Sequence, residues 1–469
     1  MRFHWKDILK AVGAARVVGP GPLRRQGLRV VTDSRETQPG DLFVALPGTK
    51  CDGHEFLSDA FRRGAAAAVV ESGVRCPGFC CLEVPDRLTA LWELAAWSRD
   101  RVPAVRIGVT GSYGKTTTRE MIYSVLSADG PATQSPRNFN NHVGVPLSLL
   151  AMSPGDRYGV FEVAASGRRE IGPLSQLVQP HVAVLTGLGR AHLGGFGSRQ
   201  VVAHEKRKLL ESVGTNGLGV MPAECLEQLG DPRSWWRGQE LVTVGTGRDA
   251  DVRARRVQFD SRGLHFWVDG TKFRVPVGGS HFLPCILAAL TVARWQGVPD
   301  RATSDALLSF EPPSGRCRVA RIGSRTVIDD SYNASPESML AACRALGEWP
   351  TTGRRVLVLG DMAELGDEAG ACHEEVGAVV GAARLGATGS GDSKGRIDDL
   401  WAVGGFSERL VRAATAAGMP DGRARSVATV DELIQVLPSW LGPGDTVLVK
   451  GARVHHMERV VQSVSGGVA

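Results

Sequence analysis

The chain has 469 residues, of which 43% are hydrophobic and 22% charged, and its formal net charge is +6. This length predicts about two to four domains, each large enough for a hydrophobic core of its own. The basic residues are spread along the chain rather than clustered, which argues against a nucleic-acid-binding surface and suits an enzyme whose substrates carry several phosphates.

Residues 1–102 read as a small α/β domain. Strands are expected near 30–31, 40–46 and 66–70, with a helix near 56–64 before the last strand. Ser34 and Arg35 follow the first strand in a polar turn. They either form ordinary turn structure or contribute to a binding site, and both interpretations stay open.

A phosphate-binding loop is expected within residues 105–121, where an apolar β-branched run gives way to glycines and then to a helix-compatible segment. Backbone N–H groups, the helix N-terminus and the Lys115 ammonium would hold phosphates there, and the Thr116 hydroxyl suits a nucleotide-bound Mg²⁺. The spacing GxxGKT is one step short of the usual motif, so a plain strand-to-helix turn is the alternative. The loop residues are Gly111, Ser112, Tyr113, Gly114, Lys115, Thr116 and Thr117.

The loop opens a central domain, residues 103–313. A strand near 158–161 leads to Glu162, and one near 182–185 leads towards His192. Ligands of open α/β sheets collect beyond the carboxyl ends of the strands, so both side chains are candidates for Mg²⁺ ligation. Between the loop and these strands lies an asparagine-rich stretch with Asn138, Asn140 and Asn141, which is typical of a loop before a helix.

The second half of the central domain is expected to be rich in β-structure. A helix over 201–210 carries Lys206 and Lys208, which would ordinarily be solvated. Short strands are then predicted at 241–244, 252–259, 263–268 and 272–275, and a helix follows over 280–295 despite Pro284.

Residues 314–469 are expected to form a third domain. Strands near 325–330, 355–359, 401–404 and 446–449 alternate with helices, which predicts a parallel sheet covered on both faces. A polar Gly/Ser loop is expected over 386–396. The predicted fold class is therefore α/β, with a small α/β N-terminal domain, a central P-loop-type ATPase domain with a β-rich excursion, and a Rossmann-like C-terminal domain.

Cysteine usage and the N-terminus predict a cytoplasmic protein without membrane insertion. The nine cysteines are scattered from Cys51 to Cys372, and only Cys76, Cys80 and Cys81 cluster. No second Cys or His pair lies at zinc-finger spacing, so free thiols in a reducing compartment are expected. The first residues are too polar for a signal peptide, and no apolar run reaches about 18 residues.

These motifs together resemble those of the Mur ligases, ATP-dependent amide-forming enzymes of peptidoglycan precursor synthesis. VTDSRETQPGDLFVALPG and DGHEF are similar to their uridine-nucleotide domain, NFNNHVGVPLSLL to a substrate-side segment, and AHLGGFGS to a metal-site motif. DDSYNASPESM and GDMAELG are the most specific strings, and they resemble the branch that adds D-Ala-D-Ala. The DNPR-like string of the branch adding a diamino acid is absent.

The resemblance implies a reaction. ATP would phosphorylate the terminal carboxylate of UDP-N-acetylmuramoyl-tripeptide, and the amine of D-Ala-D-Ala would attack the acyl phosphate. The implied cofactors are ATP and Mg²⁺, and the implied partners are these two small molecules, with no nucleic acid and a monomeric protein. Lys206 aligns with the lysine that the family carbamylates, with Lys208 as the competing candidate.

The resemblance also assigns roles to individual residues. The catalytic set is Lys115, Lys206, His192 and Arg316. The nucleotide would contact the phosphate loop together with His281, Cys285, Arg316, Asp330 and Asn333, with Asp330 on the ribose and Asp329 as the alternative register. The other substrates would contact Ser34, Arg35, Asn138, Asn140, Asn141, Asp361, Lys450 and Arg453. The metals would be held by Thr116, Glu162, His192 and Lys206.

Several positions depart from the family pattern. Tyr113 and Gly187 each stand where the family has Asn, Phe282 and Cys285 replace two further Asn residues, His142 replaces a Glu, and Ala164 replaces a Gly. Each change weakens one contact, and a thiol cannot reproduce a bidentate amide on adenine. The alternatives are therefore a Mur-type ligase for another amine, a catalytically weak homologue that binds the UDP-sugar peptide or a partner, and, with less support, a regulatory NTPase.

Overall fold

The computed structural model describes residues 2–13, 15–22, 25–48, 50–74, 78–382 and 395–466. Contacts divide the chain into a smaller unit, Met1–Gly108 with Gly130–Ala165 and Glu170–Val182, and a larger unit, Val109–Asp129 with Ser166–Arg169 and Ala183–Ala469. The boundaries 1–102, 103–313 and 314–469 stay a prediction. Cys76 and most of the predicted 386–396 loop lie outside the described residues.

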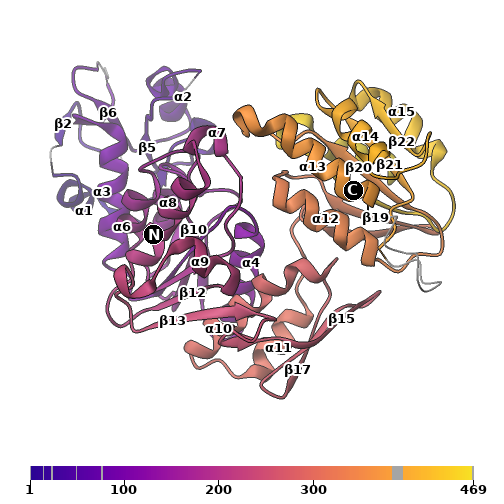
Figure 1. Ribbon diagram of the computed structural model, residues 1–469. Coiled ribbons are helices and arrows are strands. Elements are labelled where there is room, and N and C mark those ends of the chain that lie inside the picture. The colour runs from indigo at the N-terminus through magenta and orange to yellow at the C-terminus, as the bar shows by residue number, and fades with distance from the viewer. Residues whose placement is uncertain are drawn as a thin grey trace. The chain divides into compact units, whose positions relative to one another are not determined.

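The smaller unit begins with a five-stranded sheet of order β2-β7-β6-β5-β4. Figure 1 labels β2, β5 and β6 of this sheet. Strands β4 to β7 pair in parallel, and β2 is antiparallel to β7. Its strands are β2 Arg16–Val18, β4 Val30–Val31, β5 Leu42–Val44, β6 Ala67–Glu71 and β7 Cys81–Val84. The helices of this region are α1 Trp5–Ala11, α2 Leu57–Arg62 and α3 Arg87–Arg99, and a short antiparallel pair joins β1 Phe3–His4 to β3 Gln26–Leu28.

The rest of the smaller unit places Glu162 at the end of a buried strand. The strands follow the order β8-β10-β9, and β10 is parallel to β9. Every residue of β10 is buried, as an apolar β-branched and aromatic run predicts. The elements are β8 Val105–Thr110, β9 Ala132–Gln134, β10 Tyr158–Glu162, α5 Gly144–Ala151 and α6 Ile171–Val178.

In the larger unit, strands follow the order β14-β13-β12-β11-β8, where β8 contributes its last residues. Strands β12, β13 and β14 are parallel, so much of the predicted β-rich region continues a parallel sheet. The strands are β11 Val182–Leu185, β12 Leu218–Pro222, β13 Glu240–Gly245 and β14 Val252–Arg253. The helices are α4 Lys115–Ser127, α7 Leu193–Phe196, α8 Arg199–Glu211, α9 Leu226–Leu229, α10 Leu283–Trp295 and α11 Asp300–Leu308.

The β-rich excursion is a separate antiparallel sheet of β15 Arg255–Asp260, β16 Gly263–Val268 and β17 Thr271–Val275. The prediction of one strand over 252–259 is wrong, because the chain changes sheets within it. The Ala254 N–H still donates to the Gly245 carbonyl at 2.9 Å, and Arg256 then adopts a φ of 50°. Arg255 already pairs with Trp267 of β16, so this left-handed residue lies at the register shift of β15 between Arg255 and Gln258.

The C-terminal sheet has the order β18-β19-β23-β20-β21-β22, and its strands are parallel except for β18. The predicted alternation is confirmed, but β18 and β22 were not predicted. β18 is mostly exposed, and β22 has only four residues, one of them buried. The strands are β18 Arg318–Ile322, β19 Arg325–Asp330, β20 Arg355–Gly360, β21 Asp399–Val403, β22 Ala424–Val427 and β23 Thr446–Lys450. The helices are α12 Pro336–Glu348, α13 Ala369–Ala382, α14 Ser407–Ala416, α15 Val430–Trp440 and α16 Glu458–Val464.

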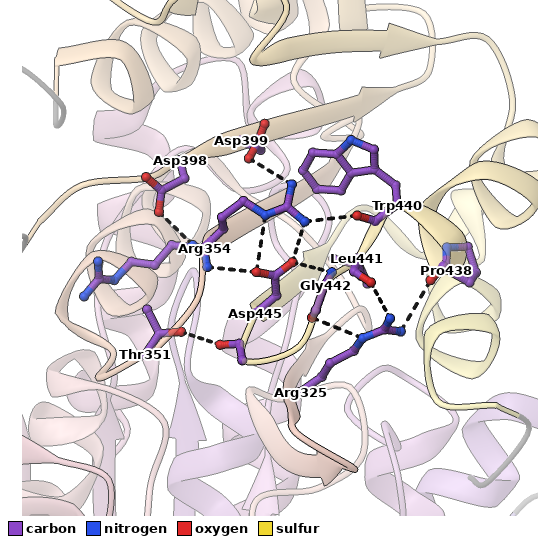
Figure 2. Close-up of polar contacts among 12 residues, drawn as sticks. Arg325, Thr351, Arg354, Asp398, Asp399, Pro438, Trp440, Leu441, Gly442 and Asp445 are labelled. Atoms are coloured by element: carbon purple, nitrogen blue, oxygen red, sulfur yellow. Dashed lines mark hydrogen bonds and ion pairs between the residues drawn. The ribbon is translucent and has the colours of Figure 1, made fainter.

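Two buried carboxylates hold together the amino ends of these strands (Figure 2). Asp445 accepts hydrogen bonds from the Arg354 backbone N–H at 2.8 Å, from Arg354 Nη2 at 2.6 Å and from the Gly442 N–H at 2.8 Å. Asp399 is fully buried and pairs with Arg354, Arg423 and Arg425. The Arg354 guanidinium also lies 3.8 Å from the centre of the Trp440 ring, so this network fixes the loops before β20 and β23.

We expect Asp445→Asn to lower the free energy of unfolding by about 1–3 kcal/mol at pH 7, since charge-assisted hydrogen bonds are lost. Burial by itself raises the pKa of Asp445, but the hydrogen bonds from Arg354 and Gly442 outweigh it, so the pKa lies below its ordinary value. This stabilisation is present above the unfolded-state pKa of about 3.9 and is lost as the pH falls through the lower folded-state pKa.

Denaturant unfolding from pH 7 down to pH 3 measures both effects. The exposed ion pair of Asp431 and Arg459 supplies the control, and Asp431→Asn should change stability by less than about 1 kcal/mol. A difference between Asp445→Asn and the unmodified protein that stays constant across this pH range would contradict the prediction.

Candidate functional site

The predicted phosphate loop is confirmed as a strand, a glycine turn and a helix. β8 ends at Thr110 and α4 begins at Lys115, with Gly114 at a φ of 75° capping the helix. The Ser112 N–H donates to the Gly187 carbonyl at 2.8 Å, so the loop rests on the segment that follows β11. Gly114 is needed because an L-residue with a side chain rarely adopts this left-handed conformation.

Two cations lie at this loop. The Lys115 ammonium donates to the Gly111 carbonyl at 2.9 Å, and Arg316 Nη2 donates to the Thr116 hydroxyl at 3.1 Å. The Arg316 guanidinium is also held 4.0 Å from the centre of the Tyr332 ring. Although Arg316 is two hundred residues from Thr116 in sequence, the fold brings it to the phosphate loop, as the resemblance implied.

His192 and Lys206 lie in the same larger unit. His192 Nδ1 contacts the Glu364 carboxylate. Burial is the main cause that holds the pKa of His192 below its ordinary value, and nearby Lys115 and Lys206 lower it further while Glu364 opposes them. A neutral imidazole is the form that binds metals.

The two lysines of α8 differ in environment. The side chain of Lys206 is 1% exposed and its Nζ lies 5.6 Å from the centre of the Phe196 ring. Lys208 is 25% exposed and donates to Glu205 at 2.7 Å. A buried amine fits a modified or metal-linked lysine, whereas Lys208 forms an ordinary ion pair, so the geometry favours Lys206.

The donor chemistry fits a Mg²⁺ ion that shares its coordination with a nucleotide. Among the described residues, no group of three or more His, Cys, Asp or Glu side chains gathers into a complete metal site. Mg²⁺ usually keeps several waters and binds through one or two carboxylates, or through the Ser/Thr hydroxyl of a phosphate loop, plus substrate phosphates. In the larger unit, the candidate ligands are the Thr116 hydroxyl, which accepts from Arg316, and the His192 imidazole, which contacts Glu364. In the smaller unit, the Glu162 carboxylate is 2% exposed and accepts from Asn140 Nδ2 at 2.8 Å.

Asp330 and Lys450 form a buried pair at the carboxyl ends of β19 and β23. Lys450 Nζ lies 2.7 Å from Asp330 Oδ2 and 2.9 Å from the Asn333 carbonyl. Burial raises the pKa of Asp330, while Lys450 opposes the shift. Asp329 instead accepts from the Gly315 N–H at 2.9 Å, which fixes the start of the C-terminal domain. The ribose role of Asp330 stays a prediction.

The first turn of α10 packs against the phosphate loop. Cys285 is buried, and its Sγ lies 3.4 Å from where a Cβ on Gly114 would stand. Burial lowers the pKa of His281 to about 3, so this imidazole is neutral. The structure therefore brings Cys285 to the loop, while contact of either residue with adenine stays a prediction.

Two departures from the family pattern, Tyr113 and Gly187, meet in space. A Cβ added to Gly187 would lie 2.5 Å from Cζ of the Tyr113 ring. The Thr186 hydroxyl donates to the Tyr113 carbonyl, which fixes the segment beneath the ring. Burial raises the pKa of Tyr113, so its phenol is neutral. The large residue at one position thus requires the absence of a side chain at the other.

Several residues predicted to bind substrates have structural roles. The Asn141 side chain accepts from the Gly144 N–H at 2.9 Å at the start of α5, and Asp361 accepts from the Gly405 N–H at 2.7 Å. Ser34 is buried, whereas the Arg35 side chain is 81% exposed and pairs with neighbouring Asp33. Binding roles for these residues and for Asn138, Asn140 and Arg453 stay predictions.

An ionic cluster that the sequence did not indicate follows β11. Arg190 pairs with Glu337 of α12 and Glu375 of α13, and the backbone N–H of Gly194 donates to the Glu364 carbonyl at 3.0 Å. No sequence signal links these residues, because they are separated by well over a hundred positions.

Among the helices that the structure describes, none combines the length and the apolar character needed to span a bilayer.

We expect Lys206→Ala to reduce the rate of the reaction that the resemblance implies by about 10- to 100-fold, as loss of a group that supports a metal ligand typically does. Lys208→Ala is the matched control from the same helix and should retain most of the activity. Phosphate release at saturating substrates measures both rates. Equal losses in the two variants would show that burial of Lys206 carries no chemical role.

Comparisons with known proteins match this arrangement over almost the whole chain. Family models describe residues 29–95 as "Mur ligase family, catalytic domain", 109–293 as "Mur ligase middle domain" and 315–453 as "Mur ligase, glutamate ligase domain". The UDP-N-acetylmuramoyl-tripeptide–D-alanyl-D-alanine ligase of Escherichia coli is 34% identical, with 93% of each chain covered. The enzyme of that name from Bacillus subtilis is 31% identical, with 93% of this chain and 92% of the relative covered.

Solved structures of MurF enzymes are also similar to this chain over most of its length. MurF from Acinetobacter baumannii matches with a TM-score of 0.85 at 28% identity, with 99% of each chain covered. MurF ligase from Thermotoga maritima in complex with ADP matches with a TM-score of 0.78 at 27% identity, with 94% of this chain and 97% of that chain covered. The fold, the phosphate loop and these similarities lead to one conclusion: the chain belongs to the Mur ligase family.

Proposed function

We propose that the protein is an ATP-dependent ligase that joins D-Ala-D-Ala to UDP-N-acetylmuramoyl-tripeptide in peptidoglycan precursor synthesis. The relatives that match over nearly the full chain carry this activity in their names. In the structure, the main support is the hydrogen bond of 3.1 Å from Arg316 Nη2 to the Thr116 hydroxyl. It brings a cation from the start of the C-terminal domain to the loop that would hold the ATP phosphates.

The proposed chemistry proceeds in two steps. A carboxylate is a poor electrophile, so its oxygen first takes the γ-phosphoryl group of ATP, which releases ADP and forms an acyl phosphate. The amine of D-Ala-D-Ala then attacks the acyl carbon, the amide bond forms, and inorganic phosphate leaves. Lys115 and Arg316 would neutralise the charge on the phosphoryl group during transfer.

Mg²⁺, held by Thr116, Glu162, His192 and Lys206, would neutralise further phosphate charge when bound. The nucleotide base would lie near His281 and Cys285, and the UDP-substrate would contact the smaller unit through Ser34 and Arg35. We also propose that the protein acts as a monomer in the cytoplasm, where ATP is made and where the eight free cysteines of the described chain would stay reduced.

Phosphate release tests the proposal. The purified protein is given ATP, Mg²⁺ and UDP-N-acetylmuramoyl-tripeptide, with D-Ala-D-Ala, D-Ala or a diamino acid added in separate reactions. Release only with the dipeptide supports the proposed activity, and release with another amine would identify a different Mur-type ligase. No release with any amine, together with retained binding of the UDP-substrate, would favour a catalytically weak binding protein, for which the departures at Tyr113 and Cys285 are the support.

A further inference from the structure

The segment that follows β11, residues 186–192, is here termed the connecting loop, and it contacts the phosphate loop on one side. The Ser112 N–H donates to the Gly187 carbonyl at 2.8 Å, and the Gly189 N–H donates to Ser112 Oγ at 3.0 Å. The Thr186 hydroxyl donates to the Tyr113 carbonyl. Two residues of the phosphate loop are therefore fixed by three successive contacts with the connecting loop.

The same loop contacts two helices of the C-terminal domain on its other side. Arg190 donates to Glu337 of α12 from its backbone N–H at 3.1 Å and from Nε at 2.9 Å. Its two terminal nitrogens donate to Glu375 of α13 at 2.5 and 3.1 Å. A Cβ on Gly189 would lie 2.5 Å from the Glu337 carboxyl carbon, so Gly189 allows this close approach.

The geometry of Arg190 suits a rigid joint rather than a loose surface ion pair. The residue is 8% exposed, and its guanidinium is shared between two carboxylates from two different helices. Bidentate pairs of this kind fix orientation as well as distance, and removing one partner of a buried pair leaves the other charge uncompensated. Arg190 directly follows Gly189, whose N–H donates to Ser112 Oγ in the phosphate loop. A displacement of α12 and α13 would therefore displace the phosphate loop through these two neighbouring residues.

We propose that Arg190 is a positioning residue that joins α12 and α13 to the phosphate loop and thereby couples nucleotide binding to the placement of the C-terminal domain. The inference rests on the proposed function for its effect on the reaction rate. With Arg190 in place, the C-terminal domain is held where Arg316 reaches the Thr116 hydroxyl. Coupling between nucleotide binding and the placement of this domain is reciprocal, so loss of the Arg190 contacts weakens nucleotide binding. The reaction slows for a separate reason, because Arg316 is no longer held at the phosphate loop.

The experiment measures ADP binding by calorimetry together with kcat and the KM values for ATP and for the UDP-substrate. Arg190→Ala should raise the ADP dissociation constant at least about 5-fold and lower kcat at least about 10-fold, while KM for the UDP-substrate stays within about 2-fold. Glu375→Gln, which removes one arm of the joint, should give a smaller change in the same direction. Partial recovery in the exchanged pair Arg190→Glu with Glu375→Arg would show that the ion pair itself is responsible.

Arg294 provides a matched control. Its guanidinium is also shared between two carboxylates, Asp300 at 2.8 Å and Asp269 at 2.8 Å, but it contacts neither the phosphate loop nor α12 in these bonds. Arg294→Ala should lower the melting temperature without changing ADP affinity. The inference is overturned if Arg190→Ala leaves ADP affinity within about 2-fold of the unmodified protein, or if Arg294→Ala weakens it equally. ADP binding requires no amine substrate, so this outcome is separate from failure of the proposed ligation.

Discussion

Lys115→Ala is expected to reduce phosphate release at saturating substrates by about 100- to 1,000-fold, because a preorganised cation is lost from the position where charge develops on the transferred phosphoryl group. In the structure, the Lys115 ammonium rests 2.9 Å from the Gly111 carbonyl. It therefore lies within the turn whose N–H groups would surround the phosphates. ADP should also bind more weakly, because its β-phosphate loses a charged partner.

The control for Lys115→Ala is Lys10→Ala, which removes an exposed lysine from the last turn of α1 and should leave the rate unchanged. Thermal unfolding of each variant shows whether the fold survives. A Lys115→Ala protein that is folded and retains more than about one tenth of the activity would contradict the proposed role and point to another phosphate-binding group.

Gly187→Asn is expected to lower both stability and nucleotide binding although it leaves every charged group of the loop in place. The new Cβ would stand 2.5 Å from the Tyr113 ring, so the ring or the loop must move. Overpacking of this kind typically costs about 1–3 kcal/mol of stability. Since Ser112 is bonded to the Gly187 carbonyl, the displaced loop should also bind ADP more weakly.

The double variant Tyr113→Asn with Gly187→Asn isolates the cause. Removing the ring should restore much of the loss, with a coupling free energy of about 1–2 kcal/mol between the two positions. Gly155→Asn is the control, because no heavy atom lies within 4 Å of a Cβ added there, and its effect should stay below about 0.5 kcal/mol. Additive losses in the double variant would show that the two positions are independent. Urea unfolding and calorimetric titration with ADP provide the measurements.

What could be predicted from the sequence depended on how local the signal is. The phosphate loop was predicted because its strand, its glycines and Lys115 lie within one short segment, and the structure confirms that order. The helix over 280–295 was predicted despite Pro284, which falls in the first turn of α10, where a proline is tolerated. The break at Ala254 was missed, because the two halves of that segment pair with strands that the local pattern does not identify.

Contacts between distant segments were the least predictable part of the site. Tyr113 and Gly187 were each recognised as a departure, but their steric dependence appears only when the ring is placed over the glycine. Arg190 carried no signal of its own, because a single arginine after a strand is ordinary and its partners lie on helices that begin far along the chain. Arg316 was predicted only through the family resemblance, since nothing local connects it to Thr116.

The two ends of strand β23 lie in two different networks of charged groups. Asp445, just before its first residue, belongs to the buried network that fixes the loops at one end of the C-terminal sheet, and Lys450, its last residue, lies beside Asp330 at the other end. A change in the network at Asp445 therefore alters the thermal tolerance of the protein without touching the groups proposed for catalysis. Substitutions at this end of the sheet are therefore expected to change the stability of the protein separately from the rate of its reaction.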